Sequence, residues 1–442
     1  MNRIGVISLG CAKNQVNTEQ MMWSLRDAGY SVSGEVEGAD VVLINTCGFI
    51  ESAKQEAIEH ILALGLMKKE GTVGSILVAG CLSERYKDEL LAELPEVDGI
   101  IGCGGFSRVT DAVAAVLEGS RPRILGDLNA PVDETPRILT TPEGWAYLKI
   151  AEGCDNRCSF CVIPDLRGRY RSRPQEAILK EAGEMAADGV RELIVVAQDI
   201  TRYGTDLYGE RRLPDLLEAL CRIDGFRWIR LHYLYPDEFS DRLIDLIAGE
   251  EKILPYLDIP IQHINDKILT RMNRRGTGND IRVLFAKLRE RIPGLVLRTS
   301  LITGLPGEGE AEYEELRAFL RRERIERAGV FPYSPEEGTP AARMADRVTT
   351  EEAVLRAEKL MELQNQIMDD FDQSRVGQIT QVLTEGFDPD QELYYGRSYA
   401  ESPDIDGVIY FEGVKTTAAG IFEQVEITRA GDGAVFGRAR KG

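Results

Sequence analysis

The sequence has few histidines, no long apolar run and no excess of positive charge. It contains three histidines among 442 residues, and its formal net charge is −20. A membrane-spanning helix needs about 18 consecutive apolar residues, which we do not find, and the apolar run near the N-terminus is too short for a secretory signal. The acidic balance disfavours non-specific adhesion to nucleic acid or anionic lipid and favours a basic partner. We therefore expect a cytoplasmic protein that does not bind membranes.

Common catalytic patterns are absent as well. The sequence contains no HExxH pair, Walker loop or Ser/His/Asp arrangement, and GCGG at 102–105 lacks the spacing of a dinucleotide-binding loop. Eight cysteines in a chain of this length are more typical of metal sites or catalysis than of a disulfide framework. We therefore expect cofactors to carry the chemistry.

The pattern of apolar runs predicts an α/β protein whose first domain spans residues 1–120. Candidate strands lie at 4–9, 41–46, 76–79 and, more weakly, 97–101, and helical segments follow them. This alternation predicts an open parallel sheet. Residues 121–143 contain four prolines and are interpreted as a linker.

Two further domains follow the linker. Residues 144–375 contain six candidate strands, at 145–151, 192–197, 228–233, 256–261, 295–302 and 328–333. Six strand–helix units with right-handed crossovers predict an incomplete (β/α)6 barrel, and Ser172 with Gln175 matches a capping box for its first helix. Residues 376–442 hold short β-rich segments separated by Gly, Pro and Asp, which predict a small antiparallel β-barrel.

Three cysteines fall within eight residues of the stretch GCDNRCSFCVIP, as Cys154, Cys158 and Cys161. A closed structural zinc site needs four ligands, and no fourth cysteine or histidine lies nearby. Three thiolates on a four-iron cluster would leave one iron without a protein ligand, free to bind a small molecule. The alternative is a zinc site completed by a distant residue.

This Cys-x₃-Cys-x₂-Cys pattern, with aromatic Phe160 before its last cysteine, resembles the radical S-adenosylmethionine (SAM) superfamily. The resemblance implies that the three cysteines hold a 4Fe-4S cluster whose open iron binds SAM. The superfamily uses an incomplete six-unit barrel, which agrees with the strand pattern.

The first domain contains a second set of three cysteines, Cys11, Cys47 and Cys81, each directly after a candidate strand. The carboxyl ends of parallel strands face one crevice, so we expect these thiols to converge. Three ligands again leave a cluster iron open. The alternative is three small thiols buried in a core.

Two three-cysteine sites followed by a small β-barrel resemble the methylthiotransferase family. SLGCAKNQVNTEQM, NTCGFIESAKQEAI and AGCLSERY resemble its N-terminal domain, GCDNRCSFCVIPDLRGRYRSRP its radical SAM core, and the last segment its TRAM domain. The resemblance implies two 4Fe-4S clusters, the second an auxiliary cluster on Cys11, Cys47 and Cys81. Cys103 and Cys221 match no ligand position and are interpreted as ordinary thiols.

Further residues are expected near SAM. Gln198 ends a candidate barrel strand, where catalytic residues of such barrels lie. TSLITGLPGE resembles the family's SAM-contacting turn, which implies contacts from Gly304, Pro306, Gly307 and Glu308. Five arginines surround the three-cysteine loop and could hold carboxylates or form surface ion pairs: Arg157, Arg167, Arg169, Arg171 and Arg173.

The family modifies either a tRNA adenosine or an aspartate of a small-subunit ribosomal protein, and charge favours the protein. Residues 376–442 carry six basic and eleven acidic residues, and residues 1–120 carry nine and seventeen. An RNA-binding barrel should be basic, whereas an acidic one suits a basic ribosomal protein. HYLYPDEFSDRLI and FPYSPEEGTPAA also resemble the ribosomal-protein branch.

The resemblance implies a radical mechanism. A 5′-deoxyadenosyl radical from SAM removes a hydrogen from the β-carbon of the aspartate in small-subunit ribosomal protein twelve, sulfur arrives through the auxiliary cluster, and a second SAM supplies the methyl group. An electron donor such as flavodoxin or ferredoxin is implied. The alternatives are a tRNA adenosine methylthiotransferase and a non-catalytic iron–sulfur or zinc protein that binds RNA.

Overall fold

The N-terminal domain is a parallel sheet covered by helices on both faces. The computed structural model of the chain describes residues 1–414, 416–431 and 433–440. The sheet order is β2-β1-β3-β4-β5-β6, with strands β1 (Arg3–Ser8), β2 (Ser31–Ser33), β3 (Val41–Thr46), β4 (Ser75–Gly80), β5 (Gly99–Gly104) and β6 (Arg123–Gly126). Strands β2 and β6 were not predicted, and β6 extends the sheet into the segment interpreted as a linker.

Helices cover both faces of this sheet. Side chains of α1 (Ala12–Asp27) and α5 (Val109–Leu117) pack on one face, and those of α2 (Glu51–Lys69) with the short helices α3 (Cys81–Tyr86) and α4 (Asp88–Glu93) pack on the other. A 3-10 turn, η1 (Phe106–Arg108), precedes α5. The sheet is therefore a buried middle layer whose strand ends are free to carry the site.

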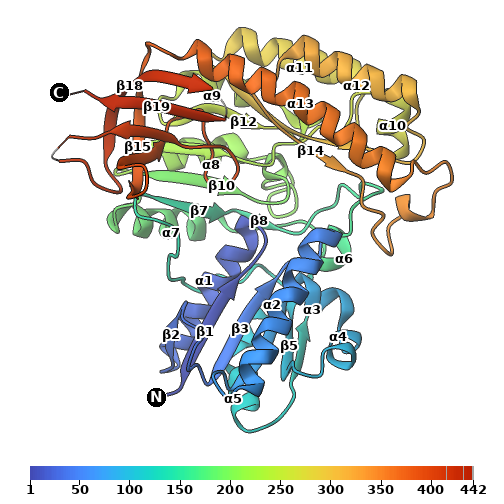
Figure 1. The fold of residues 1–442 in the computed structure, drawn as a ribbon, viewed down its shortest axis with the longest axis vertical. Helices are drawn as coiled ribbons and strands as arrows, with labels where there is room; N and C mark the ends of the chain where they lie inside the picture. The colour runs from blue at the N-terminus through green and yellow to red at the C-terminus, as the bar shows by residue number, and fades with distance from the viewer. Residues whose placement is uncertain (415, 432, 441–442) are drawn as a thin grey trace.

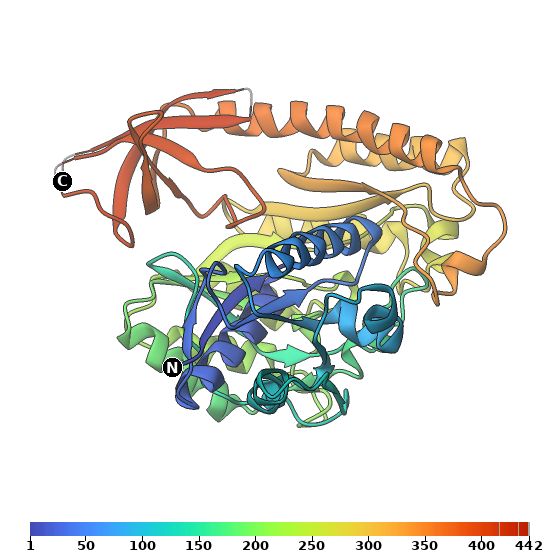
Figure 2. The same cartoon turned by 60° about the horizontal axis from the view of Figure 1, so that its bottom comes forward.

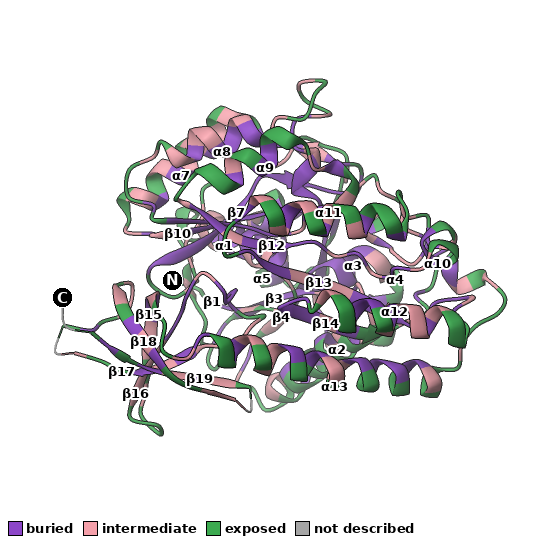
Figure 3. Cartoon of the chain, turned by 90° about the horizontal axis from the view of Figure 1, so that it is seen from above, coloured by how far each residue is buried: buried purple, intermediate pink, exposed green. Residues whose placement is uncertain are grey.

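The central domain is the open six-stranded barrel that the sequence predicts. Its parallel strands are ordered β14-β13-β12-β11-β10-β7: β7 (Trp145–Lys149), β10 (Glu192–Val196), β11 (Trp228–Leu231), β12 (Ile253–Asp258), β13 (Val296–Thr303) and β14 (Arg327–Pro332). Strands β8 (Ala151–Glu152) and β9 (Arg171–Ser172) form a separate short antiparallel pair. Figure 3 shows that the strands of both sheets are buried, while the outer helix faces are exposed.

The helices of the central domain pack on the outside of its sheet. They are α7 (Gln175–Ala187), α8 (Leu213–Cys221), α9 (Asp241–Gly249), α10 (Asp266–Arg271), α11 (Gly278–Arg291), α12 (Glu310–Glu323) and α13 (Thr350–Ser374), with 3-10 turns η2 (Ile200–Arg202), η3 (Pro236–Glu238) and η4 (Ala341–Arg343). The short helix α6 (Ile163–Arg167) instead packs against α3 and β5 of the N-terminal domain. No helix among the described residues is both long enough and apolar enough to span a bilayer.

The predicted capping box at Ser172 is wrong. Ser172 lies in β9, and its hydroxyl donates to Asp206 at 2.6 Å. Pro174 occupies the N-cap of α7 instead, and its side chain makes no capping hydrogen bond. The residue before a proline favours extended backbone, so the segment from Ser172 to Pro174 stays outside the helix.

The C-terminal domain is a closed barrel of order β15-β16-β17-β19-β18. Its strands are β15 (Ile379–Asp388), β16 (Leu393–Arg397), β17 (Ile409–Glu412), β18 (Phe422–Gly431) and β19 (Ala434–Ala439). One closing pair, β17 with β19, is parallel, although the sequence predicted an antiparallel barrel, and β19 was not predicted. Helix α13 runs along the central domain to this barrel (Figures 1 and 2).

The inner face of the open barrel is closed by the other two domains. Val16 of α1, together with Leu383 and Ala400 of the C-terminal domain, packs in one buried cluster with inward side chains of the barrel strands such as Tyr256. An open barrel would expose this apolar face to water, so the three domains bury it jointly.

A buried ion network fixes the C-terminal barrel to the central sheet. Glu192 of β10 binds Arg230 at 2.7 Å and Arg397 of β16 at 2.8 Å, and all three side chains are at most 1% exposed. Burial alone would raise the pKa of Glu192, but the charges of Arg397 and Arg230 outweigh it and lower that pKa. The ionised form of the Glu192 carboxylate is therefore stabilised by both arginines.

We predict that Arg397→Ala destabilises this junction by roughly 3 kcal/mol, because it leaves a buried carboxylate short of a partner. The matched control is Arg438→Ala on the same barrel, which removes an exposed pair with Glu412 and should leave the unfolding midpoint near the wild-type value. Denaturant unfolding followed by tryptophan fluorescence measures both, since Trp145 lies against Arg397. Equal midpoints for the two variants would contradict the role of the network.

Candidate metal and cofactor site

All six cysteines of the two sets line one cavity of about 320 Å³. Cys11 precedes α1, Cys47 directly follows β3, and Cys81 begins α3. Cys154, Cys158 and Cys161 lie in the loop between β8 and α6. The structure thus brings each expected set together and makes both sets face the same space, which the sequence did not predict.

Two glycines allow the first set to converge. Gly10 has φ +93°, and a Cβ built on it would lie 2.8 Å from the Cβ of Cys47. A Cβ on Gly48 would lie 2.8 Å from the backbone of Cys81 and Leu82. Real Cβ atoms do not approach so closely, so only glycine fits between the three cysteine turns.

Asn14 ties the same turns to each other and to the second set. Its side-chain amide donates to the carbonyl oxygens of Leu9 and Thr46, both at 3.0 Å, which holds together the ends of β1 and β3. Its side-chain oxygen accepts from the guanidinium of Arg167, which ends α6 after the Cys154–Cys161 loop. One buried amide therefore connects three of the turns that carry cysteines.

Backbone contacts fix the second set. The N–H of Ser159 donates to the carbonyl of Met272 at 2.9 Å, and the N–H of Cys161 donates to the carbonyl of Cys158 at 3.0 Å. The guanidinium of Arg274 lies 3.6 Å from the sulfur of Cys158. This loop is therefore held by the barrel, with a positive charge beside one thiol.

Cys81 is buried and the other five cysteines of the two sets are half-buried, and burial favours the neutral form of a thiol. Burial raises the pKa of Cys47 to about 12 and that of Cys154 to about 11, and it also raises the pKa of Cys161. Cys81 differs: a hydrogen bond from Cys103, reinforced by Arg167, lowers its pKa to about 6. A buried thiolate needs a compensating cation, which a metal centre supplies.

Sets of three cysteines around a common cavity fit clusters better than single ions. A tetrahedral zinc ion holds its sulfur ligands about 3.8 Å apart. Among the described residues, no three His, Cys, Asp or Glu side chains lie close enough to hold one ion. A cube with its irons at separate corners needs thiols that stand apart around a common space. Two sets of three cysteines around one cavity meet that requirement.

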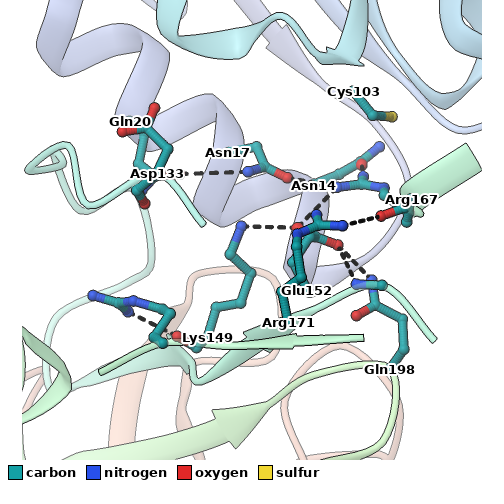
Figure 4. Close-up of polar contacts among 12 residues, drawn as sticks. Asn14, Asn17, Gln20, Cys103, Asp133, Lys149, Glu152, Arg167, Arg171 and Gln198 are labelled. Carbon is teal, nitrogen blue, oxygen red and sulfur yellow. Dashed lines mark hydrogen bonds and ion pairs between the residues drawn. The ribbon is translucent and has the colours of Figure 1, made fainter. Parts of the chain in front are cut away.

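Glu152 occupies the centre of a buried polar network beside the cavity. Figure 4 shows its carboxylate between Lys149, Arg167 and Gln198, at 3.0, 3.3 and 2.7 Å. Burial alone would raise the pKa of Glu152, but Lys149 and Arg167 outweigh it and hold that pKa well below its usual range. Because the ionised carboxylate can only accept, Gln198 must turn its NH₂ toward Glu152.

This orientation leaves the amide oxygen of Gln198 without a partner. The oxygen is buried and accepts no hydrogen bond, and Gln198 lines the six-cysteine cavity. Amide orientation is often ambiguous, but here the carboxylate decides it. Gln198 therefore carries a buried acceptor without a partner at the edge of the cavity.

The expected SAM-contacting residues separate into two groups. Phe160 and Gln198 line the cavity, whereas Gly304, Pro306, Gly307 and Glu308 do not. Glu308 accepts the N–H of Gly304 at 2.9 Å and pairs with Arg356 of α13 at 2.9 Å. That turn holds α13 against the barrel.

Of the five arginines around the loop, only Arg167 lines the cavity. Arg173, for example, pairs with Glu134 and Glu181, 2.5 Å from each. Arg167 and Arg173 therefore take part in ion pairs, whereas Arg157, Arg169 and Arg171 form none among the described residues.

Several cavity residues were not expected from the sequence. They are Lys13, Asn14 and Arg274. The ammonium of Lys13 lies 3.5 Å from the ring centre of Tyr233, which stands at the end of a candidate barrel strand and also lines the cavity. Lys13 and Asn14 follow Cys11 closely in the sequence, so their position near the first cysteine set could have been predicted. Arg274 follows α10, far from any motif, and nothing in the sequence indicated it.

Comparison with protein families identifies three regions. Residues 3–102 match a family described as uncharacterized protein family UPF0004, residues 148–320 match the radical SAM superfamily, and residues 376–439 match the TRAM domain. The matches coincide with the three domains of the structure.

Similar proteins of known name span the whole chain. The ribosomal protein uS12 methylthiotransferase RimO of Thermoanaerobacter sp. strain X514 is 47% identical over 97% of this chain and 98% of its own. The protein of the same name from Pelotomaculum thermopropionicum is 48% identical over 96% of each chain. That from Lachnoclostridium phytofermentans is 44% identical over 99% of this chain and 100% of its own.

Two solved structures share the fold. The radical SAM methyltransferase TsrM from Kitasatospora setae, with cobalamin and a [4Fe-4S] cluster bound, has a TM-score of 0.58 at 16% identity, covering 77% of this chain and 74% of its own. The cobalamin-dependent radical enzyme OxsB has a TM-score of 0.54 at 12% identity, covering 82% and 56%. At these identities the likeness concerns architecture alone.

We predict that Gly10→Ala prevents the first cysteine set from holding a cluster, because the new methyl group must displace Cys47. Anaerobic reconstitution should give about four irons per chain instead of about eight. Gly29→Ala is the control: it has φ +90° but nothing within 4 Å of its added Cβ, so it shares the backbone strain alone. Retention of about eight irons by Gly10→Ala would contradict the model of the site.

Proposed function

This chain belongs to the RimO family of ribosomal protein uS12 methylthiotransferases, and we propose that it attaches a methylthio group to the β-carbon of an aspartate in that protein. One observation carries the proposal: two sets of three cysteines, from two domains, face a single cavity. A methylthio transfer must activate a carbon and deliver sulfur to it, and a shared cavity brings both functions to one substrate atom.

Each cysteine set has a separate role. Cys154, Cys158 and Cys161 would hold the cluster that binds and cleaves SAM, and Cys11, Cys47 and Cys81 would hold the auxiliary cluster that carries sulfur. When bound, these cofactors supply radical and sulfur-transfer chemistry. The chain's own part is to hold, orient and neutralise them.

Side chains that line the cavity would neutralise and orient these cofactors. Arg274 places positive charge beside Cys158, and Arg167 does so between the two cysteine sets. Gln198 offers its fixed amide oxygen to a donor on SAM. The described cavity contains no histidine and no carboxylate among its lining residues. An unactivated carbon is too weakly acidic for any of the lining side chains to deprotonate it readily, which agrees with a radical route.

Charge supports a protein substrate over tRNA. The acidic N-terminal and C-terminal domains would attract a basic ribosomal protein and repel phosphate. We place the enzyme in the cytoplasm with its ribosomal substrate, and an electron donor such as flavodoxin or ferredoxin would reduce it.

Single cysteine substitutions should separate the two roles. We expect Cys158→Ala to reduce 5′-deoxyadenosine formation from SAM to background, and Cys47→Ala to keep that activity but yield no methylthio product. Cys221→Ala, at the end of α8, is the control and should behave as wild type. Methylthiolation by Cys47→Ala would contradict the assignment.

Product analysis distinguishes the two substrates. Mass spectrometry of uS12 and of tRNA from a strain lacking this gene should show loss of the methylthio group from uS12 alone. Loss from tRNA alone would show that the substrate is the tRNA adenosine. Formation of no 5′-deoxyadenosine by the iron-loaded wild type would favour a binding protein.

The orientation of Gln198 can be tested through Glu152. Glu152→Gln frees the Gln198 amide to rotate, and we predict about tenfold weaker SAM binding, the value of one charge-assisted hydrogen bond. Equilibrium dialysis of SAM against the iron-loaded protein measures this. Glu181→Gln alters another buried carboxylate of the barrel, which contacts Arg173 and Arg137 only, and serves as control. Equal SAM affinity of the two variants would refute the role of Glu152.

A further inference from the structure

Cys103 is a thiol that the proposed function does not use. It stands in the GCGG stretch at the end of β5, the strand next to β4, and its sulfur lies 3.9 Å from the sulfur of Cys81. Cys81 belongs to the set assigned to the auxiliary cluster. A thiol in direct contact with a ligand sulfur influences whatever that sulfur binds.

The backbone holds Cys103 in this place through the helix that carries Cys81. The N–H of Cys103 donates to the carboxylate of Glu84 at 3.0 Å, and Glu84 lies three residues after Cys81 in α3. A Cβ at Gly102 would collide with that carboxylate. The glycine before Cys103 therefore leaves the space that the Glu84 side chain occupies. Cys81 and Glu84, which binds the N–H of Cys103, therefore belong to the same short helix.

Cys103 approaches Cys81 from outside the six-cysteine cavity. It is absent from the lining of that cavity and lines a second one of about 100 Å³, together with Arg167, Lys149 and Glu152. Figure 4 shows Cys103 across Asn14 and Arg167 from Gln198, which faces the cysteine cavity. The Cys103 thiol thus lies behind Cys81.

This position does not suit a fourth ligand. Sulfurs 3.9 Å apart are as close as two ligands of one zinc ion, whereas thiolates on separate corners of an iron cube point away from each other. A thiol behind a ligand sulfur can instead donate its S–H to it. Hydrogen bonds to the sulfurs of a cluster are one of the factors that set its reduction potential.

We propose that Cys103 is a positioning residue that donates an S–H hydrogen bond to Cys81 and thereby raises the reduction potential of the auxiliary cluster. The proposal rests on the proposed function, because that function places the cluster on Cys81. The donor draws electron density from the thiolate, which stabilises the reduced and more negative state of the cluster.

The test is a redox titration of the reconstituted full-length protein, followed by electron paramagnetic resonance. Cys103→Ala should shift the auxiliary potential to a more negative value, and Cys103→Ser, which keeps an O–H donor, should restore part of the shift. The cluster on Cys154, Cys158 and Cys161 is the internal reference, and its reduction potential should not change. Cys221→Ala, which removes a half-buried thiol of α8, should leave both potentials at the wild-type value.

Iron content separates the possible failures. About eight irons in Cys103→Ala with an unmoved auxiliary potential would overturn the tuning role alone. Loss of about four irons from that variant would show that Cys103 is a ligand and would overturn it as well. About four irons in the wild type would contradict the proposed function and, with it, the role of Cys103.

Discussion

The site depends on one buried contact, between the side-chain oxygen of Asn14 and the guanidinium of Arg167. Asn14 uses both N–H groups to hold the ends of β1 and β3, so its oxygen is left to accept from the other domain. Arg167 ends the short helix after the radical SAM cysteines and also binds Asn17 and Glu152. The pair with Glu152 lies within the central domain, but the bonds of Arg167 to Asn14 and Asn17 require the N-terminal domain, and buried N–H groups without acceptors are costly. The contact therefore sets the position of one cysteine set against the other.

The open barrel makes such an arrangement necessary. Six strands do not close on themselves, and the inner face of the sheet must be covered by other parts of the chain. Helix α1 covers part of it and begins directly after Cys11, so the covering element also delivers a cysteine to the cavity. The C-terminal barrel covers another part through Ala400 and is fixed there by Arg397. The burial of one apolar face thus unites three domains around one site.

Local patterns predicted the elements and the two cysteine sets, because strand periodicity and cysteine spacing are properties of neighbouring residues. All six barrel strands lie where the pattern placed them. The common cavity was not predictable, since it follows from how two domains dock, and neither Arg274 nor the orientation of Gln198 belongs to a local motif. The turn from Gly304 to Glu308 was expected near SAM, but it binds Arg356, a partner remote in sequence. Cys103 matched no ligand position, and its contact with Cys81 arises from the pairing of β4 with β5.

The central claim is that both cysteine sets face one space, and the magnetic interaction between their clusters tests it most directly. In the reduced, reconstituted protein, two paramagnetic clusters at one cavity should couple, so the electron paramagnetic resonance spectrum should differ from the sum of two isolated clusters. Removing one set by Cys47→Ala should leave the simple spectrum of a single cluster. A wild-type spectrum equal to the sum of two independent clusters would place the sets apart and contradict the shared cavity.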